Sequence, residues 1–530
     1  MAIHKLKVTK LDDDYCGVAY QGANRFVIRG ALPGELVLAE EQEKFGSITL
    51  CRLQRVLTPS PDRCTPTCSL VGACGGCELR HVNPSAQCAY KSAYVRRKLA
   101  AVGLNVEVAP TVSAEGLRNK VHLVFGRSRS RVTLGFFNAK THTVVDAPQC
   151  PAHGRWYAPL VGTLKRWATE SNIPIYDPAT GKGYLRFALV RRLAAGLMVT
   201  IVATKPLTGL DSLYTALTKL FPHVSLWQNV NAKRTNEVFG EEFIHIGGER
   251  KLSSSMLGIP FTLAPDSFFQ TNTQIATQIY RAVCDFIAPQ EGADGHILDL
   301  YSGIGITSAL FASRGYTVDS VESNPSACAD SIDTCRRAGV LERVHVHQGE
   351  VVTILPTLQS TSETALFADP PRAGLGEEVC EAILQLAPSR IAYLSCNPHT
   401  LATDLKRLSS AYNIISVTPY DMFPNTSHVE TVILLSRKDV YERIKFDVNV
   451  EDLQGRASST ATYSEIKAYI LEKYGLKVSS LYIAQIKDKC GFEKRDNYNI
   501  GEGKSKELIC PPDKEAAIMD AFRHFGMLRD

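Results

Sequence analysis

The chain has 530 residues, of which 45% are hydrophobic and 21% are charged, and its formal net charge at pH 7 is +5. This length exceeds what one hydrophobic core holds, so we expect roughly three or four domains. The longest nearly uncharged apolar stretch, residues 193–203, is too short to cross a bilayer, which takes about 20 residues. The chain starts MAIHKLKVTKLDDDY, without a visible secretory signal, so we expect a cytoplasmic protein that does not contact membranes.

Cysteine content and local charge carry more information than the overall composition. In a reducing cytosol, fifteen cysteines are more typical of metal ligands, free thiols and catalytic groups than of disulfides. Between Pro84 and Val145, ten Lys or Arg residues stand against two acids, Glu107 and Glu115. A phosphate-binding surface requires such an excess, although a solvated face without a partner has the same composition.

The first 58 residues contain short strand-like runs, at 25–29, 35–39 and 48–53, separated by turns that contain glycine. Closely spaced strands with glycine turns predict a small barrel. Barrels of this size often bind single-stranded nucleic acid, but the pattern alone is weakly specific. Residues 59–63, PSPDR, read as a linker.

A cysteine cluster follows in CTPTCSLVGACGGC, residues 64–77. Cys68, Cys74 and Cys77 have C-x5-C-x2-C spacing, and the glycine pair between the last two lets the backbone fold tightly around one centre. The candidates for a fourth ligand are Cys64, Cys88 and Cys150. Zinc also accepts four thiolates, usually as two close pairs. The wide first gap and the remote fourth ligand favour an iron-sulfur cluster over zinc.

Residues 185–258 are rich in strand-like segments but contain no chemical motif, so they read as sheet-containing recognition structure. Residues 267–287, SFFQTNTQIATQIYRAVCDFI, end in a helical period of apolar side chains.

The stretch HILDLYSGIGITSALFASRG, residues 296–315, predicts a buried strand, a tight turn with Gly303 and Gly305, and a helix from Ile306. The next strand ends in Glu322. Glycines let a backbone approach a ligand, and an acid at that strand end can accept both hydroxyls of a ribose. The turn lacks the third glycine of the dinucleotide fingerprint, so its spacing suits S-adenosylmethionine better than NAD. A turn without a ligand has the same pattern.

Two further strand ends carry reactive side chains, Asp369 in ALFADPPRAG and Cys396 in IAYLSCNP. In open α/β sheets ligands bind outside the carboxyl ends of the strands, so Glu322, Asp369 and Cys396 should converge. This convergence argues against a purely packing role for Cys396, which is the usual role of a free cysteine. His428 and Glu430 precede a further apolar strand, where Glu430 could face the same crevice.

Together these motifs resemble the class I S-adenosylmethionine-dependent RNA uracil-5-methyltransferases, and among them the enzymes that modify 23S ribosomal RNA. The resemblance covers about residues 5–440 and is carried by a start that looks like a TRAM domain and by CSLVGACGGC, LRNK, SFFQTN, DLYSGIG, DPPRAG, SCNP and HVET. It implies a Rossmann-like α/β methyltransferase domain, an OB-like TRAM β-barrel at the N-terminus, and a central β-rich domain that holds an iron-sulfur cluster and binds RNA.

The resemblance also implies cofactors, ligands and a partner. The cofactors are S-adenosylmethionine and a 4Fe-4S cluster, and the partner is large-subunit ribosomal RNA bound by a monomer. The implied cluster ligands are Cys68, Cys74, Cys77 and Cys150, with Cys64 as a bystander. With the two glycines of the turn included, the expected contacts of S-adenosylmethionine are Gln270, Tyr301, Gly303, Gly305, Glu322 and Asp369.

Uracil chemistry gives the strand-end residues their expected roles. Carbon 5 of uracil is too weak a nucleophile to take a methyl group directly, but a thiolate that adds to carbon 6 makes carbon 5 enolate-like. We therefore expect Cys396 to be the nucleophile. Glu430 is the expected base that removes the carbon 5 proton, with His428 as a weaker candidate and Asp369 positioning the target base or the cofactor. The target uridine must be flipped out, with the basic region and the barrel holding the flanking strand.

The sequence departs from the family pattern at Ser302, where cysteine is common, and at Leu117, which replaces a usual tyrosine. A larger departure is residues 441–530, which the family pattern does not require. There, Thr462 and Glu465 form a capping box and a second helix is expected near residues 479–489. Docking on RNA or protein and a structural cap fit this segment equally well.

We expect four parts: a barrel at 1–60, a central domain at 61–258, the methyltransferase domain at 259–440 and a helical extension at 441–530.

A first rival function is methylation of transfer RNA. Against it, the barrel and the iron-sulfur motif look characteristic of the family members that modify ribosomal RNA. A non-catalytic RNA-binding protein would not need Cys396, Glu430 and an intact crevice together. A radical S-adenosylmethionine enzyme would have C-x3-C-x2-C spacing, which this chain lacks in its cysteine motif.

Overall fold

The computed structural model describes residues 2–114, 117–129, 131–139, 141, 143–235, 237–289, 295–361, 363–438, 463–476, 478, 480–490 and 511–525. The contacts between residues divide the chain into two units, residues 1–441 and 442–530. Among the described residues, no helix combines the length and the apolar character needed to span a membrane.

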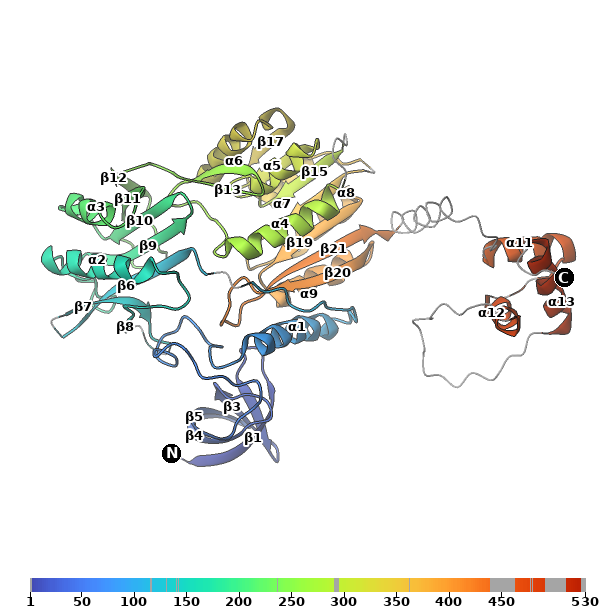
Figure 1. The fold of residues 1–530 in the computed structure, drawn as a ribbon, viewed down its shortest axis with the longest axis horizontal. Coiled ribbons are helices and arrows are strands. Elements are labelled where there is room, and N and C mark those ends of the chain that lie inside the picture. The colour runs from blue at the N-terminus through green and yellow to red at the C-terminus, as the bar shows by residue number, and fades with distance from the viewer. Residues whose placement is uncertain are drawn as a thin grey trace. The chain divides into compact units, whose positions relative to one another are not determined.

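The first unit begins with a closed five-stranded barrel (Figure 1). Its strands, in the order β1-β2-β3-β5-β4, are β1 (Ile3–Leu11), β2 (Gly17–Gln21), β3 (Asn24–Arg29), β4 (Leu36–Phe45) and β5 (Ile48–Thr58). Side chains alternate between the inside and the solvent, as in β1, where Leu6 and Val8 are buried and Lys5 and Lys7 are exposed. The predicted barrel is therefore present.

A seven-stranded sheet, in the order β12-β11-β10-β9-β6-β7-β8, forms the middle of this unit. Its strands are β6 (Lys120–Ser128), β7 (Arg131–Phe137), β8 (Val144–Asp146), β9 (Leu185–Leu193), β10 (Gly196–Ala203), β11 (Val224–Val230) and β12 (Glu242–Gly247). Helices α2 (Tyr157–Glu170) and α3 (Leu210–Thr218) bury their apolar side chains, such as Leu164 and Leu213, in one core with this sheet. We call it the central sheet.

A second seven-stranded sheet, in the order β17-β16-β15-β18-β19-β21-β20, is called the catalytic sheet below. Its strands are β15 (His296–Leu300), β16 (Thr317–Glu322), β17 (Val344–Gln348), β18 (Ala365–Ala368), β19 (Arg390–Ser395), β20 (Tyr412–Tyr420) and β21 (Glu430–Arg437). The strands from β17 to β19 in this order are parallel, whereas β21 is antiparallel to both β19 and β20.

Helices cover both faces of the catalytic sheet. Helices α4 (Thr273–Ile287), α5 (Ile306–Ser313) and α6 (Pro325–Arg337) share a core with one face, and α1 (Pro84–Ala101), α8 (Gly376–Leu386) and α9 (Pro398–Leu408) share a core with the other. The predicted α/β architecture is thus confirmed. Helix α1 precedes the central sheet in the chain yet packs on the catalytic sheet. Shorter elements are β13 (Leu252–Met256), β14 (Ile259–Leu263), α7 (Val351–Ile354), η1 (Leu341–Arg343) and η2 (Leu355–Thr357).

The second unit contains the helices α11 (Tyr463–Tyr474), α12 (Ser480–Lys489) and α13 (Pro512–His524). Their buried side chains, among them Ile470, Ile483 and Phe522, form one apolar core. Thr462 lies outside the described residues, and so does the side chain of Glu465, so the expected capping box stays a prediction.

Candidate active site

Four strand ends and one strand start meet at one edge of the catalytic sheet. Tyr301, Glu322, Asp369 and Cys396 end or directly follow the parallel strands β15, β16, β18 and β19. Because β21 runs in the opposite direction, its first residue, Glu430, lies at this same edge. Ser395 pairs with Thr431, and this register places Glu430 beside Cys396.

Cys396 and Glu430 share a buried environment. Burial raises the pKa of the Cys396 thiol to about 11, the negative charge of Glu430 adds to this rise, and the Arg372 guanidinium opposes it. Glu430 is only 6% exposed. Burial raises the pKa of its carboxyl to about 7, again against the effect of Arg372. Near neutral pH, a thiol that holds its proton therefore faces a carboxyl that is about half ionised.

Asp369 lies near Glu430 and Cys396, and its charge acts on the Cys396 thiol. Burial raises the pKa of its carboxyl well above the usual range, and the nearby carboxyls of Glu430 and Asp299 raise it further. Gln270 Nε2 donates a hydrogen bond to Asp369 Oδ2 at 3.4 Å. A carboxyl that keeps its proton can itself donate a hydrogen bond to a ligand.

Tyr280 on α4 also belongs to this crevice, and sequence reasoning missed it. Burial raises the pKa of its hydroxyl, and the charges of Asp369 and Asp299 add to that rise. Tyr280 follows Ile279, one of the apolar residues that define the predicted helix. The helical period alone shows only that Tyr280 follows a residue of the packed face of α4. The folded structure is needed to show that its hydroxyl lies near Asp369 and Asp299.

Asp299, the first residue of the D-x-x-x-G-x-G turn, fastens α5 to β15. It is fully buried, and its Oδ2 accepts hydrogen bonds from Thr307 Oγ1 at 2.7 Å and Ser308 Oγ at 2.5 Å. Its other carboxylate oxygen, Oδ1, has no hydrogen-bond partner. Burial raises the pKa of Asp299 to about 6.

Glu322 is held by backbone donors at the end of β16. Its Oε2 accepts a hydrogen bond from the Gly303 amide at 3.0 Å, and its Oε1 accepts one from the Asn324 amide at 2.8 Å. Tyr301, which begins the turn, has a left-handed φ of 59°. The turn and the acid predicted to bind a cofactor are therefore in direct contact.

The two glycines of the turn have different physical roles. Both have left-handed φ angles, 56° at Gly303 and 76° at Gly305. A Cβ added at Gly303 would meet nothing within 4 Å, so a ligand can approach the backbone there. A Cβ added at Gly305 would lie 2.2 Å from Ser331 Oγ, so this glycine allows α5 to pack closely on α6.

The segment that carries Gln270 is fixed by the central sheet. Asn119 Nδ2, from the LRNK motif, donates to the Gln270 carbonyl and to Thr273 Oγ1, both at 3.0 Å. Arg191 Nη2 donates to the Ser267 carbonyl at 2.6 Å. Asn119 and Arg191 are both buried. The central sheet thus holds the SFFQTN segment in place above the strand ends.

His428, the weaker candidate base, is engaged by Arg372. Arg372 Nη2 donates to His428 Nδ1 at 3.0 Å, and Asn397 Nδ2 donates to the Arg372 carbonyl at 3.0 Å. Burial and the Arg372 charge both lower the pKa of His428, so the ring is neutral at pH 7 and accepts this hydrogen bond. His428 therefore joins the DPPRAG loop to the segment that leads to Glu430.

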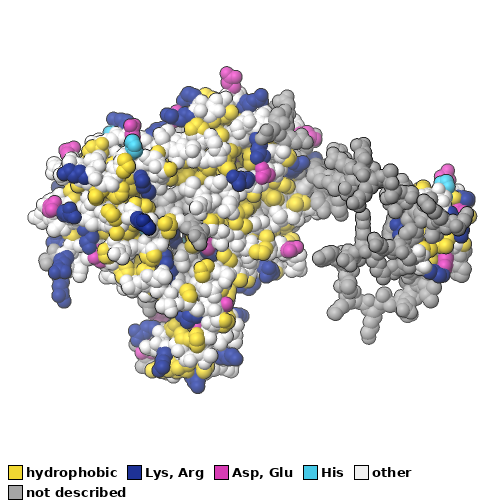
Figure 2. All heavy atoms as spheres, in the orientation of Figure 1, with side chains coloured by type: hydrophobic (Ala, Val, Ile, Leu, Met, Phe, Trp, Pro, Cys, Tyr) yellow, Lys and Arg dark blue, Asp and Glu magenta, His cyan; other side chains and the backbone are white. Residues whose placement is uncertain are grey.

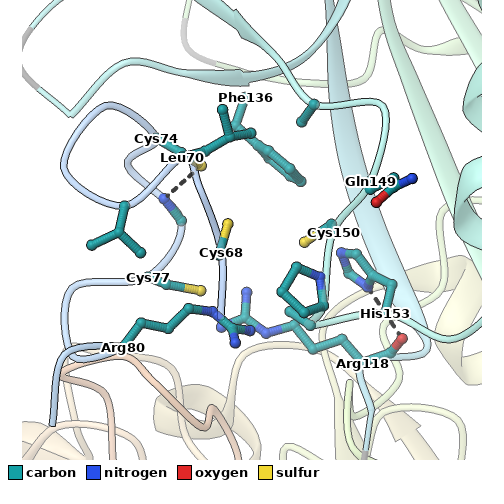
Figure 3. Close-up of a pocket in the computed structure, with 15 residues that line it drawn as sticks. Cys68, Leu70, Cys74, Cys77, Arg80, Arg118, Phe136, Gln149, Cys150 and His153 are labelled. Atoms are coloured by element: carbon teal, nitrogen blue, oxygen red, sulfur yellow. Dashed lines mark hydrogen bonds between the residues drawn. The ribbon is translucent and has the colours of Figure 1, made fainter. Parts of the chain in front are cut away.

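A second candidate site is a cavity of about 40 Å³ whose lining includes Cys68, Cys74, Cys77 and Cys150. Figure 3 shows the sulfur atoms of Cys68, Cys77 and Cys150 directed into one space. The Gly76 amide donates to Cys74 Sγ at 3.4 Å, and the Arg118 charge lies close enough to lower the pKa of this thiol, which burial raises. A backbone donor and a nearby positive charge therefore both act on the Cys74 sulfur.

The three candidates for a fourth ligand lie in different places. Cys150 lines the cavity, whereas Cys64 Sγ donates to the Arg80 carbonyl at 3.5 Å and Cys88 lines a separate hollow. Within the described residues, no group of three or more His, Cys, Asp and Glu side chains is arranged to hold a metal ion.

The basic segment has less free charge than its composition suggests. Lys91 is fully buried and paired with Asp421, and Lys98 Nζ lies 2.6 Å from Asp13. Arg127, Arg129 and Arg131, at the β6-β7 hairpin, are exposed. Their guanidinium groups remain free to meet phosphates. Figure 2 shows the Lys and Arg side chains distributed over the barrel and the central-sheet region rather than in one patch.

Known proteins resemble this chain over most of its length. The family model for tRNA (uracil-5-)-methyltransferase matches residues 355–438, and that for RNA cap guanine-N2 methyltransferase matches residues 294–381. An uncharacterized RNA methyltransferase of Clostridium tetani is 32% identical, over 78% of this chain and 92% of the relative. One of Halalkalibacterium halodurans is 31% identical, over 82% of this chain and 97% of the relative.

Among solved structures, the Pyrococcus abyssi tRNA (uracil-54, C5)-methyltransferase in complex with S-adenosyl-L-homocysteine matches with a TM-score of 0.67 and 27% identity. The match covers 81% of this chain and 99% of that chain. This chain therefore belongs to the class I RNA (uracil-5-)-methyltransferase family, as the sequence motifs predict, and it is an RNA methyltransferase that uses S-adenosylmethionine.

The Arg372 charge lowers the pKa of the Cys396 thiol, so its removal should change the rate at which this thiol is alkylated. We expect Arg372→Met to raise the pKa of Cys396 and so to lower its alkylation rate below pH 11, by up to about tenfold, the thiolate ratio that one pKa unit represents. The measurement is iodoacetamide labelling between pH 7 and 10, read by mass spectrometry of the peptide that contains Cys396. Arg407→Met, whose guanidinium pairs with Glu377 at 3.2 Å, is the control. Equal rates in both variants would contradict the electrostatic link.

Proposed function

We propose that this enzyme methylates carbon 5 of a uridine in 23S ribosomal RNA through a covalent adduct with Cys396. The observation that carries the proposal is the pairing of a half-buried thiol, Cys396, with a buried carboxyl, Glu430, at the edge of the catalytic sheet where the parallel strands end. Glu322 and the open backbone at Gly303 lie at the same edge and suit the methyl donor.

The reaction uses both partners of this pair. The Cys396 thiol first releases its proton to solvent. The thiolate Sγ then bonds to carbon 6, and the electron pair of the C5–C6 double bond moves onto carbon 5 and the carbonyl at position 4. Carbon 5 then takes the methyl group from the sulfonium of S-adenosylmethionine, which leaves as S-adenosylhomocysteine. Glu430 removes the remaining proton from carbon 5, the double bond re-forms, and the thiolate leaves carbon 6.

The raised pKa values of the Glu430 and Asp369 carboxyls suit these steps. A carboxyl with a pKa of about 7 is ionised enough at neutral pH to accept a proton and acidic enough to release it again. Burial raises the pKa of Asp369 well above its usual range, and in its protonated form this carboxyl can donate a hydrogen bond to the uracil oxygen that gains negative charge. Because Glu430 must be ionised to act, removal of the carbon 5 proton should speed up as the pH rises through about 7.

Transfer RNA is the second candidate substrate. The Pyrococcus abyssi relative is a tRNA enzyme, and 99% of its chain is matched here, so the shared architecture does not separate the two substrates. We favour ribosomal RNA on the resemblance of the motifs taken together. In either RNA the target uridine must leave its stack to reach a crevice at the sheet edge, with the barrel and the exposed arginines near β6 and β7 contacting the flanking strand.

We also propose that Cys68, Cys74, Cys77 and Cys150 hold a 4Fe-4S cluster. Four thiols around one cavity are the ligand set that such a cluster takes, and the Gly76 amide and the nearby positive charge of Arg118 favour sulfur in its anionic form. The cluster would cross-link the segment before α1 to the segment after β8. We assign it a structural role, because the methyl transfer needs no electron. We further propose that the domains are divided at residues 60, 258 and 440 and that the protein is a monomer.

Labelling identifies the substrate. Unmodified transcripts of 23S ribosomal RNA and of transfer RNA, incubated separately with methyl-labelled S-adenosylmethionine, should give label in the 23S transcript, recovered as 5-methyluridine after digestion to nucleosides. Label in transfer RNA alone would overturn the choice of substrate but keep the chemistry. Label in another nucleoside would overturn the uracil chemistry itself.

Two substitutions separate the steps of the reaction. Cys396→Ala should abolish both methyl transfer and adduct, since no other group replaces the thiolate. Glu430→Gln should leave a methylated protein-RNA adduct, visible as a shifted band on a denaturing gel, and should slow turnover by about 10² to 10⁴-fold, the usual contribution of a general base. The control is His428→Asn. If His428→Asn accumulates adduct and Glu430→Gln does not, His428 is the base.

The composition of the cysteine site can be measured without activity. Protein purified without oxygen should contain about four iron and four sulfide per chain, and Cys150→Ser should lose most of both. Cys64→Ser should keep them, because Cys64 lies outside the cavity. One zinc per chain with no sulfide would support the competing metal site instead.

A further inference from the structure

The loop that connects β20 to β21 ends at the proposed base. Tyr420 closes β20 and pairs with Glu430, the first residue of β21, so residues 421–429 form the connection of this hairpin. We call these residues the base loop. Its conformation sets where β21 begins and therefore where the carboxyl of Glu430 lies.

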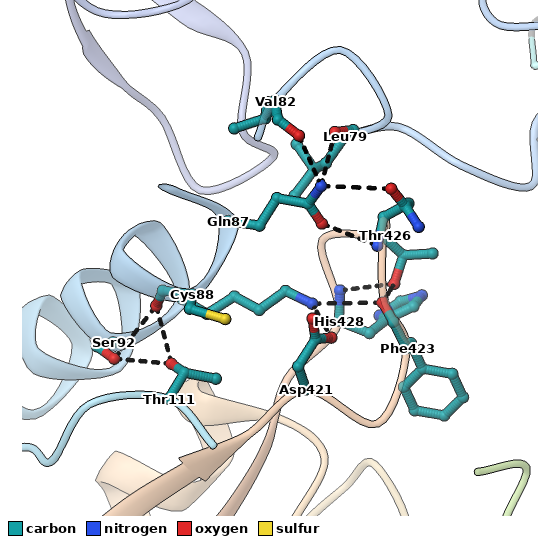
Figure 4. Close-up of polar contacts among 12 residues, drawn as sticks. Leu79, Val82, Gln87, Cys88, Ser92, Thr111, Asp421, Phe423, Thr426 and His428 are labelled. Atoms are coloured by element: carbon teal, nitrogen blue, oxygen red, sulfur yellow. Dashed lines mark hydrogen bonds and ion pairs between the residues drawn. The ribbon is translucent and has the colours of Figure 1, made fainter. Parts of the chain in front are cut away.

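Gln87 on α1 holds the middle of the base loop (Figure 4). Its Oε1 accepts a hydrogen bond from the Asn425 amide at 2.9 Å, and its Nε2 donates to Asn425 Oδ1 at 3.3 Å. The same Nε2 donates to the carbonyls of Val82 at 2.8 Å and Leu79 at 3.2 Å. Gln87 is 3% exposed, so few waters could replace these bonds.

Asn425 is the contact point of the loop. Its carbonyl accepts a hydrogen bond from the Leu79 amide at 3.0 Å, so both of its backbone polar groups bond to the segment around α1. Its φ is 66°, a left-handed conformation that asparagine adopts more readily than most residues. Residues 79–87 therefore fix an unusual turn of the base loop.

Lys91, one helical turn further along α1, holds the start of the base loop. Its Nζ donates to Asp421 Oδ1 at 2.5 Å and to the Phe423 carbonyl at 3.3 Å. Lys91 is fully buried and Asp421 is 4% exposed. Burial lowers the pKa of Lys91 while Asp421 opposes that change, so this contact rests on a desolvated ion pair.

Hydrogen bonds continue from the middle of the loop toward the site. Thr426 Oγ1 donates to the Phe423 carbonyl at 2.8 Å and accepts from the His428 amide at 3.4 Å. The His428 ring in turn accepts from Arg372 Nη2 at 3.0 Å, and Arg372 lies near both Cys396 and Glu430. A displacement of Asn425 would therefore change the segment that places Glu430.

We infer that Gln87 is a positioning residue for the proton-removal step. It contacts neither Cys396 nor Glu430 in the described hydrogen bonds, and it acts by fixing the base loop against α1. The inference rests on the proposed role of Glu430 as the base. Loss of the Gln87 bonds should slow the breakdown of the methylated adduct more than its formation, because attack by Cys396 depends on β19 and α9 rather than on the base loop.

The test uses the full chain, methyl-labelled S-adenosylmethionine and the transcript that accepts label in the assay above. Gln87→Met keeps the length of the side chain and removes its hydrogen bonds. We expect turnover to fall by about tenfold to 10²-fold, the cost of a misplacement of about 1 Å, and the methylated adduct to accumulate on denaturing gels. The KM for S-adenosylmethionine should stay within about twofold, since the glycine turn is not touched.

Gln228→Met is a matched control for a purely structural effect. Gln228 is 1% exposed, its Oε1 accepts from the Leu207 amide at 3.0 Å, and its Nε2 donates to the Lys205 carbonyl at 2.8 Å in the central-sheet region. This variant should lower the Tm without adduct accumulation. If Gln87→Met folds poorly, Asn425→Gly keeps the left-handed backbone, removes the contact with Gln87 Nε2 and should also accumulate adduct.

Three outcomes separate the two levels of inference. Adduct in Glu430→Gln and in Gln87→Met supports the positioning role. Adduct in Glu430→Gln, with neither Gln87→Met nor Asn425→Gly differing from Gln228→Met, overturns the positioning role and leaves the proposed function standing. No adduct in Glu430→Gln removes the base assignment, and the role of Gln87 falls with it.

Discussion

Burial of acidic groups at the strand ends is the constraint on which the site depends. The Cys396 thiol and the carboxyls of Asp369 and Glu430 are all partly or fully withdrawn from water, and the charge of Glu430 also raises the pKa of Asp369 and Cys396. Water would stabilise their charged forms, so the crevice favours groups that keep their protons. The Arg372 guanidinium works in the opposite direction at both Cys396 and Glu430. The result is a set of proton donors and acceptors whose pKa values lie closer to neutral pH, or above it, than those of ordinary carboxyls.

This arrangement is supported from outside the catalytic sheet. Asn119 and Arg191, from the central sheet, hold the segment of Gln270 through buried hydrogen bonds. Gln87 and Lys91, from α1, hold the loop that ends at Glu430. The chain ahead of residue 258 therefore contributes buried hydrogen bonds that hold the segments around Gln270 and Glu430.

Much of the fold and part of the site could be predicted from the sequence. The rule that ligands bind outside the carboxyl ends of parallel strands brought Glu322, Asp369 and Cys396 to one edge, and the structure has them there. Gln87 and Asn425 are 338 positions apart, and Asn119 and Gln270 are 151 apart. No local period or motif connects such pairs, so only the folded chain reveals them. The count of Lys and Arg residues overstated the exposed positive charge for the same reason. Lys91 is paired with Asp421, which lies on a loop that is distant in the sequence.

The antiparallel pairing of β21 with β19 limits which sequence changes this family can accommodate. Successive side chains of a strand point to opposite faces, so a slip of one residue between β19 and β21 would turn the Glu430 carboxyl away from the thiol and bury a different side chain in its place. Point changes inside these strands keep Cys396 and Glu430 as neighbours. A single inserted or deleted codon within either strand would separate them, whatever amino acid it encoded.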